Sequence, residues 1–482
     1  MATTQRLTHG AVAAAAREAD EEDVDHHDSR LLDFVSICER SLGQPSSTSN
    51  LAFGHSVTLA QLDQLVVALN RDSPIHFISC YSIREHTKLG RGASGSVRIA
   101  ELKHITSASS SCVPSADETV EASEAFPPAI AMKQMALTNS VNSMECISRE
   151  LSAISSLAAH TKRKAGTALA APTANGPGCL VQLPNVIQIF STQLDAEVTI
   201  AMELMAGSLS SRDAASRPFP AHRHDTLHLI ARSVLNGLGE LHDCRLVHND
   251  LKPANILWNT VSCPSSDLTR KLVFKVCDFG SCEMIGNVAA NDPPSPGGSP
   301  NTLSSPVMSP RGHAVIGTGA YMAPERSRCL PYDGRADVWS LGLAVIEIAA
   351  ELTEPFGVTL AHGALSRMNL SPLPDTSSTI KVCYTAMLTD FPDVANDWPA
   401  FCRSEISAAL ARCPKRLADG LMPSLASSLS PSLLPPQPSH STTDLNAFID
   451  FAVECLTLDA RRRPTVAELL TRPSVWCSVS ME

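Results

Sequence analysis

Several features that would assign this chain to other classes of protein are missing. Lysine and arginine number 38 against 49 acidic residues, a formal net charge of −11, so binding to nucleic-acid phosphates is not expected. The 15 cysteines lack paired Cys-x-x-Cys metal spacing and lie in apolar runs, as in proteins of a reducing compartment. The most apolar stretch, from Val338, is too short for a membrane span and contains Glu347 and Glu351. The N-terminus is polar and acidic, so we expect a soluble cytoplasmic protein.

The 482 residues, 44% of them hydrophobic, leave room for one large domain with additional segments. Residues 1–50 combine an alanine run with an acidic tract, which predicts a disordered tail. His26 and His27 in this tail could bind a metal, but a solvated tail explains them better. Residues 51–80 predict an amphipathic helix behind a Thr58 N-cap, whose apolar residues at helical spacing are Leu59, Leu62, Leu65, Val66 and Leu69. It would pack on the following domain, or act as an inhibitory or partner-binding helix.

The stretch HNDLKPANIL, from His248 to Leu257, carries a concentrated set of polar groups. Its spacing H-x-D-x-K-x-x-x-N is that of protein-kinase catalytic loops. In such a loop Asp250 accepts the proton of the substrate hydroxyl, Lys252 balances charge on the transferred phosphoryl group, and Asn255 binds a metal ion. A surface turn with a capping aspartate is the alternative interpretation of these ten residues taken alone.

A glycine-rich pattern lies upstream, and its glycines would let a hairpin approach nucleotide phosphates. The pattern G-x-G-x-x-G-x-V is formed by Gly90, Gly92, Gly95 and Val97. The strand-like AIAMK follows, with Lys133 placed to reach the α- and β-phosphates. A helix over 143–157 offers Glu150 as the ion-pair partner of Lys133, with Glu145 as the alternative. The remaining predicted ATP-binding residues are Leu89, Ala131, Met202, Glu203, Met205 and Leu257.

Motifs of the same kind continue downstream in the order found in protein kinases. Asp278, in Asp-Phe-Gly with Phe279 and Gly280, would bind magnesium, and Phe279 would pack beneath the helix bearing Glu150. The remaining predictions are Thr318 between the catalytic Asp and Lys, Glu325 paired with a buried Arg463, and Asp337 beneath the catalytic loop. Six motifs in one order predict an α+β, two-lobed protein kinase fold. Its small lobe has a five-stranded sheet and one helix, and its large lobe is mainly helical.

Within the kinases, the chain resembles the MAP kinase kinases. The resemblance rests on MELM from Met202, Cys277 before Asp-Phe-Gly, YMAPER from Tyr321, and a Pro/Ser-rich insert before FIDFAVECL. It implies ATP and Mg²⁺ as cofactors and a MAP kinase as substrate, phosphorylated on Thr and Tyr of its activation loop. An upstream kinase or a scaffold would be a further partner. A Ser/Thr kinase of another group, or a pseudokinase that binds without catalysis, are the alternatives.

The resemblance also divides the chain. The kinase domain would span 81–476, with a small lobe over 81–205 and a large lobe over 206–476. Composition predicts inserts at 103–128, 161–180, 283–312 and 415–443. The insert 161–180 contains KRKAGTAL, which is either a docking peptide for a MAP kinase or a solvated basic loop.

Two departures from the family concern activation. Asn249 stands where the family has an arginine before the catalytic aspartate, so the usual cationic receptor for an activation-loop phosphate is missing. The family's activating hydroxyls are also missing, and only Ser309 lies near their position. Four serines in the long activation segment precede proline: Ser295, Ser299, Ser305 and Ser309. A proline-directed kinase such as the downstream MAP kinase could phosphorylate them as feedback. Alternatively, they belong to a passive linker.

Overall fold

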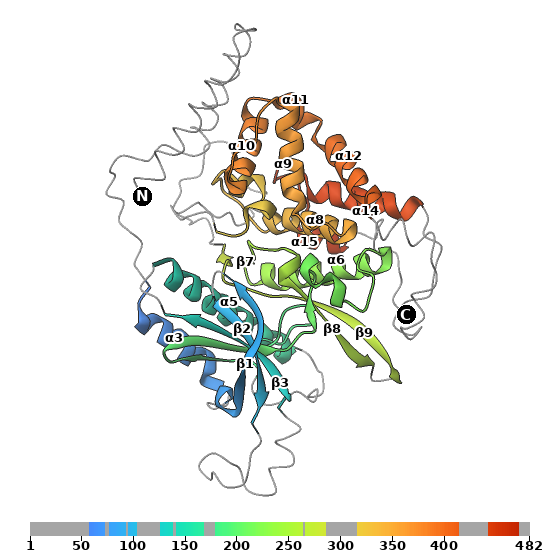
Figure 1. Cartoon of the computed structure of the whole chain (residues 1–482). Helices are drawn as coiled ribbons and strands as arrows, with labels where there is room; N and C mark the ends of the chain where they lie inside the picture. Colours follow the sequence, from blue (N-terminus) through green and yellow to red (C-terminus); the bar gives the residue numbers. More distant parts are fainter. Residues whose placement is uncertain are drawn as a thin grey trace, which may run out of the picture.

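The computed structural model has two lobes, a small one built on a sheet and a large one built mostly of helices (Figure 1). The predicted α+β kinase organisation is therefore confirmed. The predicted tail 1–50 and the four Ser-Pro sites lie outside the described residues, which are 57–72, 77–92, 95–103, 126–137, 141–167, 179–263, 266–285, 316–413 and 442–471. Within these ranges, no helix is both long and apolar enough to cross a membrane.

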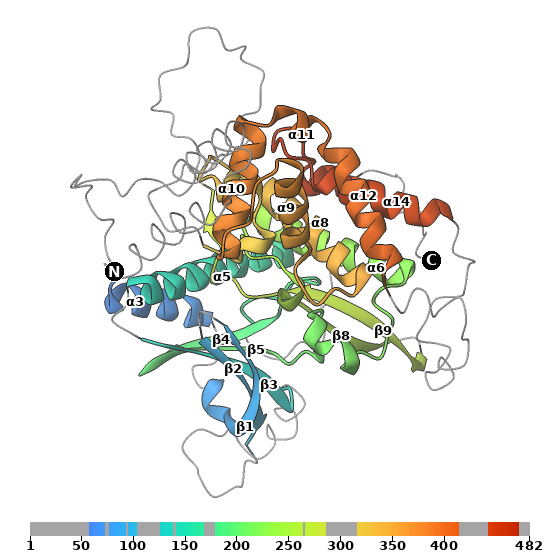
Figure 2. The same cartoon turned by 45° about the horizontal axis from the view of Figure 1, so that its top comes forward.

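The small lobe is an antiparallel sheet of five strands in the order β1-β2-β3-β5-β4. Its central strand β3 is buried at four consecutive residues because neighbouring strands cover both edges and side chains cover both faces. The strands are β1 (Tyr81–Gly92), β2 (Gly95–Leu102), β3 (Ala129–Ala136), β4 (Ile189–Leu194) and β5 (Glu197–Glu203). The helix α5 (Val141–Thr167) crosses between this sheet and the large lobe (Figures 1 and 2).

Helix α3 (Leu59–Leu69) is the amphipathic helix that the sequence predicts. Thr58 caps it as expected, because the amide of Gln61 donates to the Thr58 hydroxyl at 3.3 Å and the Thr58 amide donates to the Gln61 side chain at 2.8 Å. Leu62, Val66 and Leu69 are buried in one cluster with α5, whereas Leu59 is 55% exposed and does not join the core. The helix therefore packs on α5, beside which it lies in Figures 1 and 2.

The prediction of a loop over 161–180 is wrong for residues 161–167, because α5 continues to Thr167. The residues after Leu157 include alanine, lysine and arginine, which are strong helix formers, and the first glycine is Gly166. The basic residues of KRKAGTAL up to Thr167 thus belong to a helix. Strand β4 begins at Ile189, and Val186 before it forms an isolated bridge with Val276 of the large lobe.

The other three predicted inserts also span fewer residues than predicted, because residues inside their predicted bounds belong to the fold. Glu283 and Met284, inside the predicted insert 283–312, form β10 and pair with Val247 and Leu246 of β7. Helix α14 begins at Thr442, within the predicted insert 415–443. Phe126, inside the predicted insert 103–128, packs against Phe77 with 5.4 Å between ring centroids.

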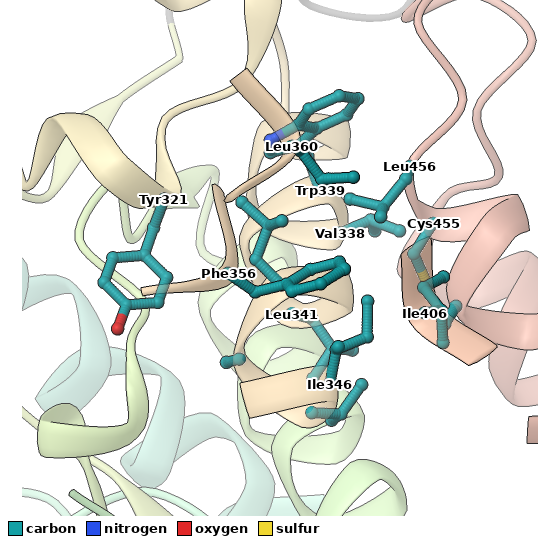
Figure 3. Packing of buried hydrophobic residues seen from close by; sticks show 14 of the residues in the cluster. Tyr321, Val338, Trp339, Leu341, Ile346, Phe356, Leu360, Ile406, Cys455 and Leu456 are labelled. Atoms are coloured by element: carbon teal, nitrogen blue, oxygen red, sulfur yellow. The ribbon is translucent and has the colours of Figure 1, made fainter. Parts of the chain in front are cut away.

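The large lobe is organised around α8 (Arg335–Ala350), which is buried along nearly its whole length. A helix apolar on all sides needs neighbours on all sides, and Figure 3 shows Val338, Trp339 and Leu341 of α8 meeting Phe356 and Leu456. The other helices are α6 (His224–Asp243), α7 (Pro324–Ser327), α9 (Phe356–Arg367), α10 (Thr376–Thr389), α11 (Pro392–Asn396), α12 (Trp398–Ala411), α14 (Thr442–Cys455) and α15 (Val466–Thr471).

Short strands and 3-10 turns are the remaining described elements of the two lobes. The strands are β6 (Gly207–Ser208), β7 (Leu246–Val247), β8 (Ile256–Cys263), β9 (Ser266–Val276) and β10 (Glu283–Met284). The 3-10 turns are η1 (Asn70–Asp72), η2 (Ile78–Cys80), η3 (Ser211–Ser216), η4 (Pro253–Asn255) and η5 (Gly319–Tyr321). Because β7 and β8 flank the stretch 248–255, this loop opens toward the small lobe, beneath β3 and α5.

Candidate active site

Asp250 lies at the centre of a cluster of polar groups on the loop between β7 and β8. Its Oδ1 accepts hydrogen bonds from the amide of Thr318 at 2.8 Å and from the Thr318 hydroxyl at 2.7 Å. Its Oδ2 accepts from the Lys252 ammonium at 2.7 Å, and the same ammonium donates to the Thr318 hydroxyl at 2.7 Å. The sequence expectation that Thr318 lies between Asp250 and Lys252 agrees with this geometry.

A buried carboxylate beneath the loop holds its backbone in place. Asp337 at the start of α8 is fully buried and accepts from the amides of His248 and Asn249, both at 2.9 Å. Its Oδ2 also lies 2.8 Å from Nε2 of His242. Burial alone would raise the pKa of Asp337, but the hydrogen bond with His242 and the loop amides keep this pKa below its ordinary value. Asp337 therefore stays ionised and fixes the start of the catalytic loop.

Lys133 of β3 forms an ion pair with Glu150, and this pair joins the sheet to α5. Its ammonium donates to the two Glu150 oxygens at 2.6 and 2.7 Å and to Asp278 Oδ1 at 2.8 Å. The alternative partner Glu145 is wrong, because it pairs with Arg149 at 3.6 Å. Burial would lower the pKa of Lys133, but the two carboxylates raise it above its ordinary value. Lys133 in turn holds the pKa of Asp278 below its usual range against the effect of burial.

The glycine-rich hairpin is closed by the pairing of Gly92 with Gly95, and its tip, residues 93–94, lies outside the described residues. A Cβ on Gly95 would lie 2.3 Å from the carbonyl oxygen of Gln134, so only glycine fits there. Val97 pairs with Lys133 across β2 and β3. The pairing of β2 with β3 thus places the predicted phosphate-binding loop next to Lys133, which is predicted to bind the α- and β-phosphates.

The predicted adenine-binding residues gather where the two lobes join. Ala131 pairs with Met202 across β3 and β5, and Met202 and Leu257 are partly buried against the same apolar cluster. Met205 is buried, whereas Leu89 on β1 is 49% exposed. The side chain of Glu203 is engaged elsewhere, because it accepts from Lys275 and from the amide of Gln188. The Glu203 side chain is thus not available to a hinge, and its amide donates to the carbonyl of Gln188 at 3.0 Å.

Asn255 and Asp278 have the donor atoms that magnesium prefers. The Asn255 amide nitrogen donates to the carbonyl oxygen of Asp250 at 2.8 Å, which leaves its amide oxygen for another partner. Among the described residues, neither this oxygen nor the second carboxylate oxygen of Asp278 accepts a hydrogen bond. Magnesium takes oxygen ligands such as carboxylates and phosphates, so these two residues fit the ion that the family implies.

The other predicted structural residues have the partners that the motifs suggest. Phe279 is 1% exposed and belongs to the apolar cluster that includes Leu151 of α5. The carbonyl oxygen of Gly280 accepts from Cys146 and Arg149 of the same helix, both at 3.4 Å. The predicted buried pair also forms, with Arg463 donating to Glu325 at 2.7 and 3.1 Å.

Asn249 takes part in a hydrogen-bond network that the sequence did not reveal. Its backbone has a positive φ of 68°, a conformation that asparagine adopts more readily than most residues. Its side-chain nitrogen donates to the carbonyl of Ser281 and to the Tyr332 hydroxyl, both at 3.2 Å, and Tyr332 donates to Glu283. Arg326 donates to the Asn249 carbonyl at 2.8 Å and lies 5.1 Å from the centroid of the Tyr332 ring. No sequence spacing connects Tyr332 to Asn249, so only the fold could show this contact.

Comparisons with known proteins agree with this geometry. The model of the protein kinase domain matches residues 179–475. MAP kinase kinase MKK1/SSP32 of Saccharomyces cerevisiae is 33% identical over 166 residues, 33% of this chain and 26% of the relative. Mitogen-activated protein kinase kinase 5 of Leishmania mexicana is 35% identical over 156 residues, or 32% and 23% of the two chains. Serine/threonine-protein kinase 36 of Mus musculus is 30% identical over 220 residues, which cover 45% of this chain and 14% of the relative.

The aligned region spans 14% to 26% of the length of these three relatives. The match to the family model, in contrast, covers more than half of the chain and includes the catalytic loop, Asp278 and the pair of Glu325 with Arg463. The ion pair of Lys133 with Glu150 lies outside the matched range but completes the same constellation. The chain therefore belongs to the protein kinase domain family and, within it, resembles the MAP kinase kinases.

Proposed function

We propose that this protein is an ATP-dependent Ser/Thr or dual-specificity protein kinase that phosphorylates the activation loop of a MAP kinase. The observation that carries the catalytic part of the proposal is the position of the Lys133 ammonium, in contact with both Glu150 and Asp278. This contact brings together the sheet, α5 and the predicted metal site, which must all be in place for phosphoryl transfer. A pseudokinase would have no need to keep all of these groups together.

The residues of the catalytic loop have defined tasks in this reaction. The Asp250 carboxylate would orient the substrate hydroxyl and accept its proton, in place of one of the bonds that it now receives from Thr318 and Lys252. Lys252 would stabilise negative charge on the transferred phosphoryl group. Because the transition state of phosphoryl transfer is loose, positioning and charge stabilisation supply most of the rate.

Asp278 and Asn255 would hold magnesium, which supplies positive charge to the β- and γ-phosphates when bound. Lys133 would bind the α- and β-phosphates while Glu150 fixes its direction. The raised pKa of Lys133 keeps its ammonium charged at any physiological pH. The glycine-rich hairpin would cover the phosphates from the other side of Lys133.

The MAP kinase substrate is supported by the YMAPER motif and by two relatives that are named MAP kinase kinases. Similarity to serine/threonine-protein kinase 36 supports the second candidate, a Ser/Thr kinase of another group. The proposal includes the division into a tail, a helical extension and a kinase domain over 81–476. It also includes a cytoplasmic location, as the resemblance to MAP kinase kinases implies.

The test is transfer of radiolabelled phosphate from ATP to a generic protein and to a panel of catalytically inactive MAP kinases. We expect label on Thr and Tyr of one activation loop, and no label with Asp250→Ala. The matched control is Asp225→Ala on α6, which removes a partly buried carboxylate outside the site. Label on a generic protein but on no MAP kinase would favour a kinase of another group. No transfer to any protein, with the wild type folded, would favour the pseudokinase.

A further inference from the structure

Helix α5 reaches much further than its role as the carrier of Glu150 requires. It continues several turns beyond Glu150 to Thr167, and this extension lies against the large lobe. His160 and Lys164 stand four residues apart, so both side chains project from the same face of the helix. This face is directed at α6, the helix that leads through β7 into the catalytic loop.

Both side chains meet one carboxylate on α6. Nε2 of His160 lies 2.8 Å from Oε2 of Glu240. The Lys164 ammonium donates to both Glu240 oxygens, at 2.7 and 2.6 Å. The Glu240 side chain is 15% exposed and that of His160 10%, so water screens this contact only in part. Nearby, the Cys244 thiol donates to the Ser156 carbonyl at 3.9 Å, a second link between the same two elements.

Asp243 also lies close to His160 and Glu240, which raises the alternative of a metal site. Lys164 argues against it, because its ammonium already neutralises the Glu240 carboxylate and would repel a cation bound there. The arrangement is better explained as a cross-link between α5 and α6.

The cross-link constrains the Lys133 ion pair. Ten residues of helix, about 15 Å, separate Glu150 from His160, and the helix between them is continuous. Leu157 of α5 and Leu241 of α6 pack in the same buried cluster, beside the polar contacts. A rotation of α5 that withdraws Glu150 from Lys133 would therefore have to break the contacts of Glu240.

We propose that Glu240 is a positioning residue, which fixes α5 through His160 and Lys164 so that Glu150 stays paired with Lys133. This rests on the proposed function only in that Lys133 binds ATP phosphates. The large lobe would thus hold the small-lobe helix in its ion-paired position through a permanent contact.

The experiment compares the wild type with Glu240→Ala, Lys164→Ala and the double variant. Amide hydrogen exchange without nucleotide reports on the mobility of α5, and steady-state kinetics give KM values for ATP and for a protein substrate. We expect faster exchange within 143–160 and a KM for ATP raised by roughly threefold to thirtyfold, with KM for the protein substrate unchanged. The two single effects should be non-additive in the double variant, because both remove the same contact.

Two further variants separate positioning from general stability. Glu240→Gln keeps an acceptor oxygen and should restore part of the ATP affinity that Glu240→Ala loses. Asp450→Ala removes a comparable but half-exposed pair with Arg403 of the large lobe and should change neither readout. Lys164 is 51% exposed, so its replacement can be studied even if Glu240→Ala fails to fold.

Unchanged exchange in α5 and unchanged KM for ATP in Lys164→Ala and Glu240→Ala would overturn the proposal. So would faster exchange spread evenly over both lobes, since that indicates loss of general stability. The exchange measurement needs no ATP, so it still decides the role of Glu240 if the wild type proves unable to bind nucleotide. Failure of the wild type to bind nucleotide would instead refute the proposed function.

Discussion

At the scale of single residues, the site depends on charged groups that stabilise one another in a buried place. Lys133 is 7% exposed in its side chain, and the positive charge there is tolerated because two carboxylates surround it. Removal of Lys133 would leave Glu150 and Asp278 without this partner, whereas removal of Asp278 leaves Lys133 paired with Glu150. Two predictions at this scale separate groups needed for catalysis from groups that affect only stability.

The first prediction concerns Asp278. Asp278→Ala should lower turnover by roughly 100-fold or more, because a group that stabilises charge in the transition state is lost. Its thermal unfolding temperature should stay close to that of the wild type, since one third of the side chain is exposed. Asp397→Ala, which breaks an exposed pair with Arg367, is the control and should keep full activity. A folded Asp278→Ala protein with near-normal turnover would refute the assignment of Asp278.

The second prediction concerns Glu347 of α8, which accepts a hydrogen bond from the Tyr321 hydroxyl at 2.5 Å. Burial raises the pKa of Glu347 from 4.5 to about 7. The folded state therefore binds this proton more tightly than the unfolded state, so the contribution of Glu347 to stability is full below pH 4.5 and is lost as pH rises through 7. Each pKa unit corresponds to about 1.4 kcal/mol, so the cost at pH 8 is about 3 kcal/mol.

Glu347→Gln removes this titration while it keeps an acceptor for Tyr321. The loss of unfolding free energy between pH 5 and pH 8 should be smaller in this variant by about 2–3 kcal/mol. Denaturant unfolding at several pH values measures it, and Glu354→Gln, an exposed glutamate in the loop after α8, is the control. Parallel pH profiles for wild type and Glu347→Gln would show that Glu347 is ionised in the folded protein at pH 5.

At the scale of elements, α3 and α5 behave as one unit. Leu62 of α3 is fully buried against residues of α5 such as Ile147 and Leu151. The face of α3 toward solvent includes Leu59 and Val67, which are 55% and 61% exposed. Helix α3 therefore has one face that packs on α5 and another face that is exposed to solvent.

The third prediction uses these two sides. Leu62→Ala should destabilise the protein by about 2–5 kcal/mol, as expected for loss of a buried leucine. It should also lower activity, because α5 carries Glu150. Leu59→Ala, a matched change in the same helix, should alter the unfolding free energy by about 0.5 kcal/mol or less. If Leu62→Ala raises activity instead, α3 is an inhibitory helix, which is the alternative that its sequence left open.

The elements also show why parts of the fold could be predicted and others could not. Helix α3 was predictable because its cap and its apolar spacing are local signals, although the exposure of Leu59 was not. The composition of 161–180 predicts a loop, whereas local helix formers and the contacts of His160 and Lys164 with Glu240, far away in sequence, continue α5 to Thr167. The motifs predict Lys133, Asp250 and Asp278 as site residues, while the network of Asn249 with Tyr332 requires tertiary contacts that no motif encodes.

At the scale of the whole molecule, the two lobes share one apolar cluster. Leu241, Leu246 and Phe279 of the large lobe are buried together with Leu151 and Ile154 of the small lobe. The lobes are further joined by Lys133 with Asp278 and by Glu240 with α5. These contacts join the two lobes around the site.

The last prediction follows from this assembly and from the surroundings of Asn249. In place of an arginine that would receive a phosphate, Asn249 bonds to Ser281 and Tyr332, while Arg326 holds the carbonyl groups of Asn249 and Ile316. The described residues on each side of 286–315 are therefore held by neutral hydrogen bonds and one buried guanidinium. Phosphatase treatment should leave activity within about twofold of its starting value, since no ion pair with a phosphate is lost.

Variants show whether this network replaces the phosphate. Tyr332→Phe removes the hydroxyl that Asn249 and Glu283 share, and it should lower activity by roughly fivefold, about 1 kcal/mol for a lost hydrogen bond. Ser309→Ala, at the one candidate site near the family's phosphorylated positions, should be tolerated. A large fall in activity after phosphatase, traced by mass spectrometry to a residue between Ser281 and Tyr321, would contradict the prediction. Arg326 would then be the first residue to test as the receptor, because its guanidinium contacts the backbone at position 316, where the described chain resumes.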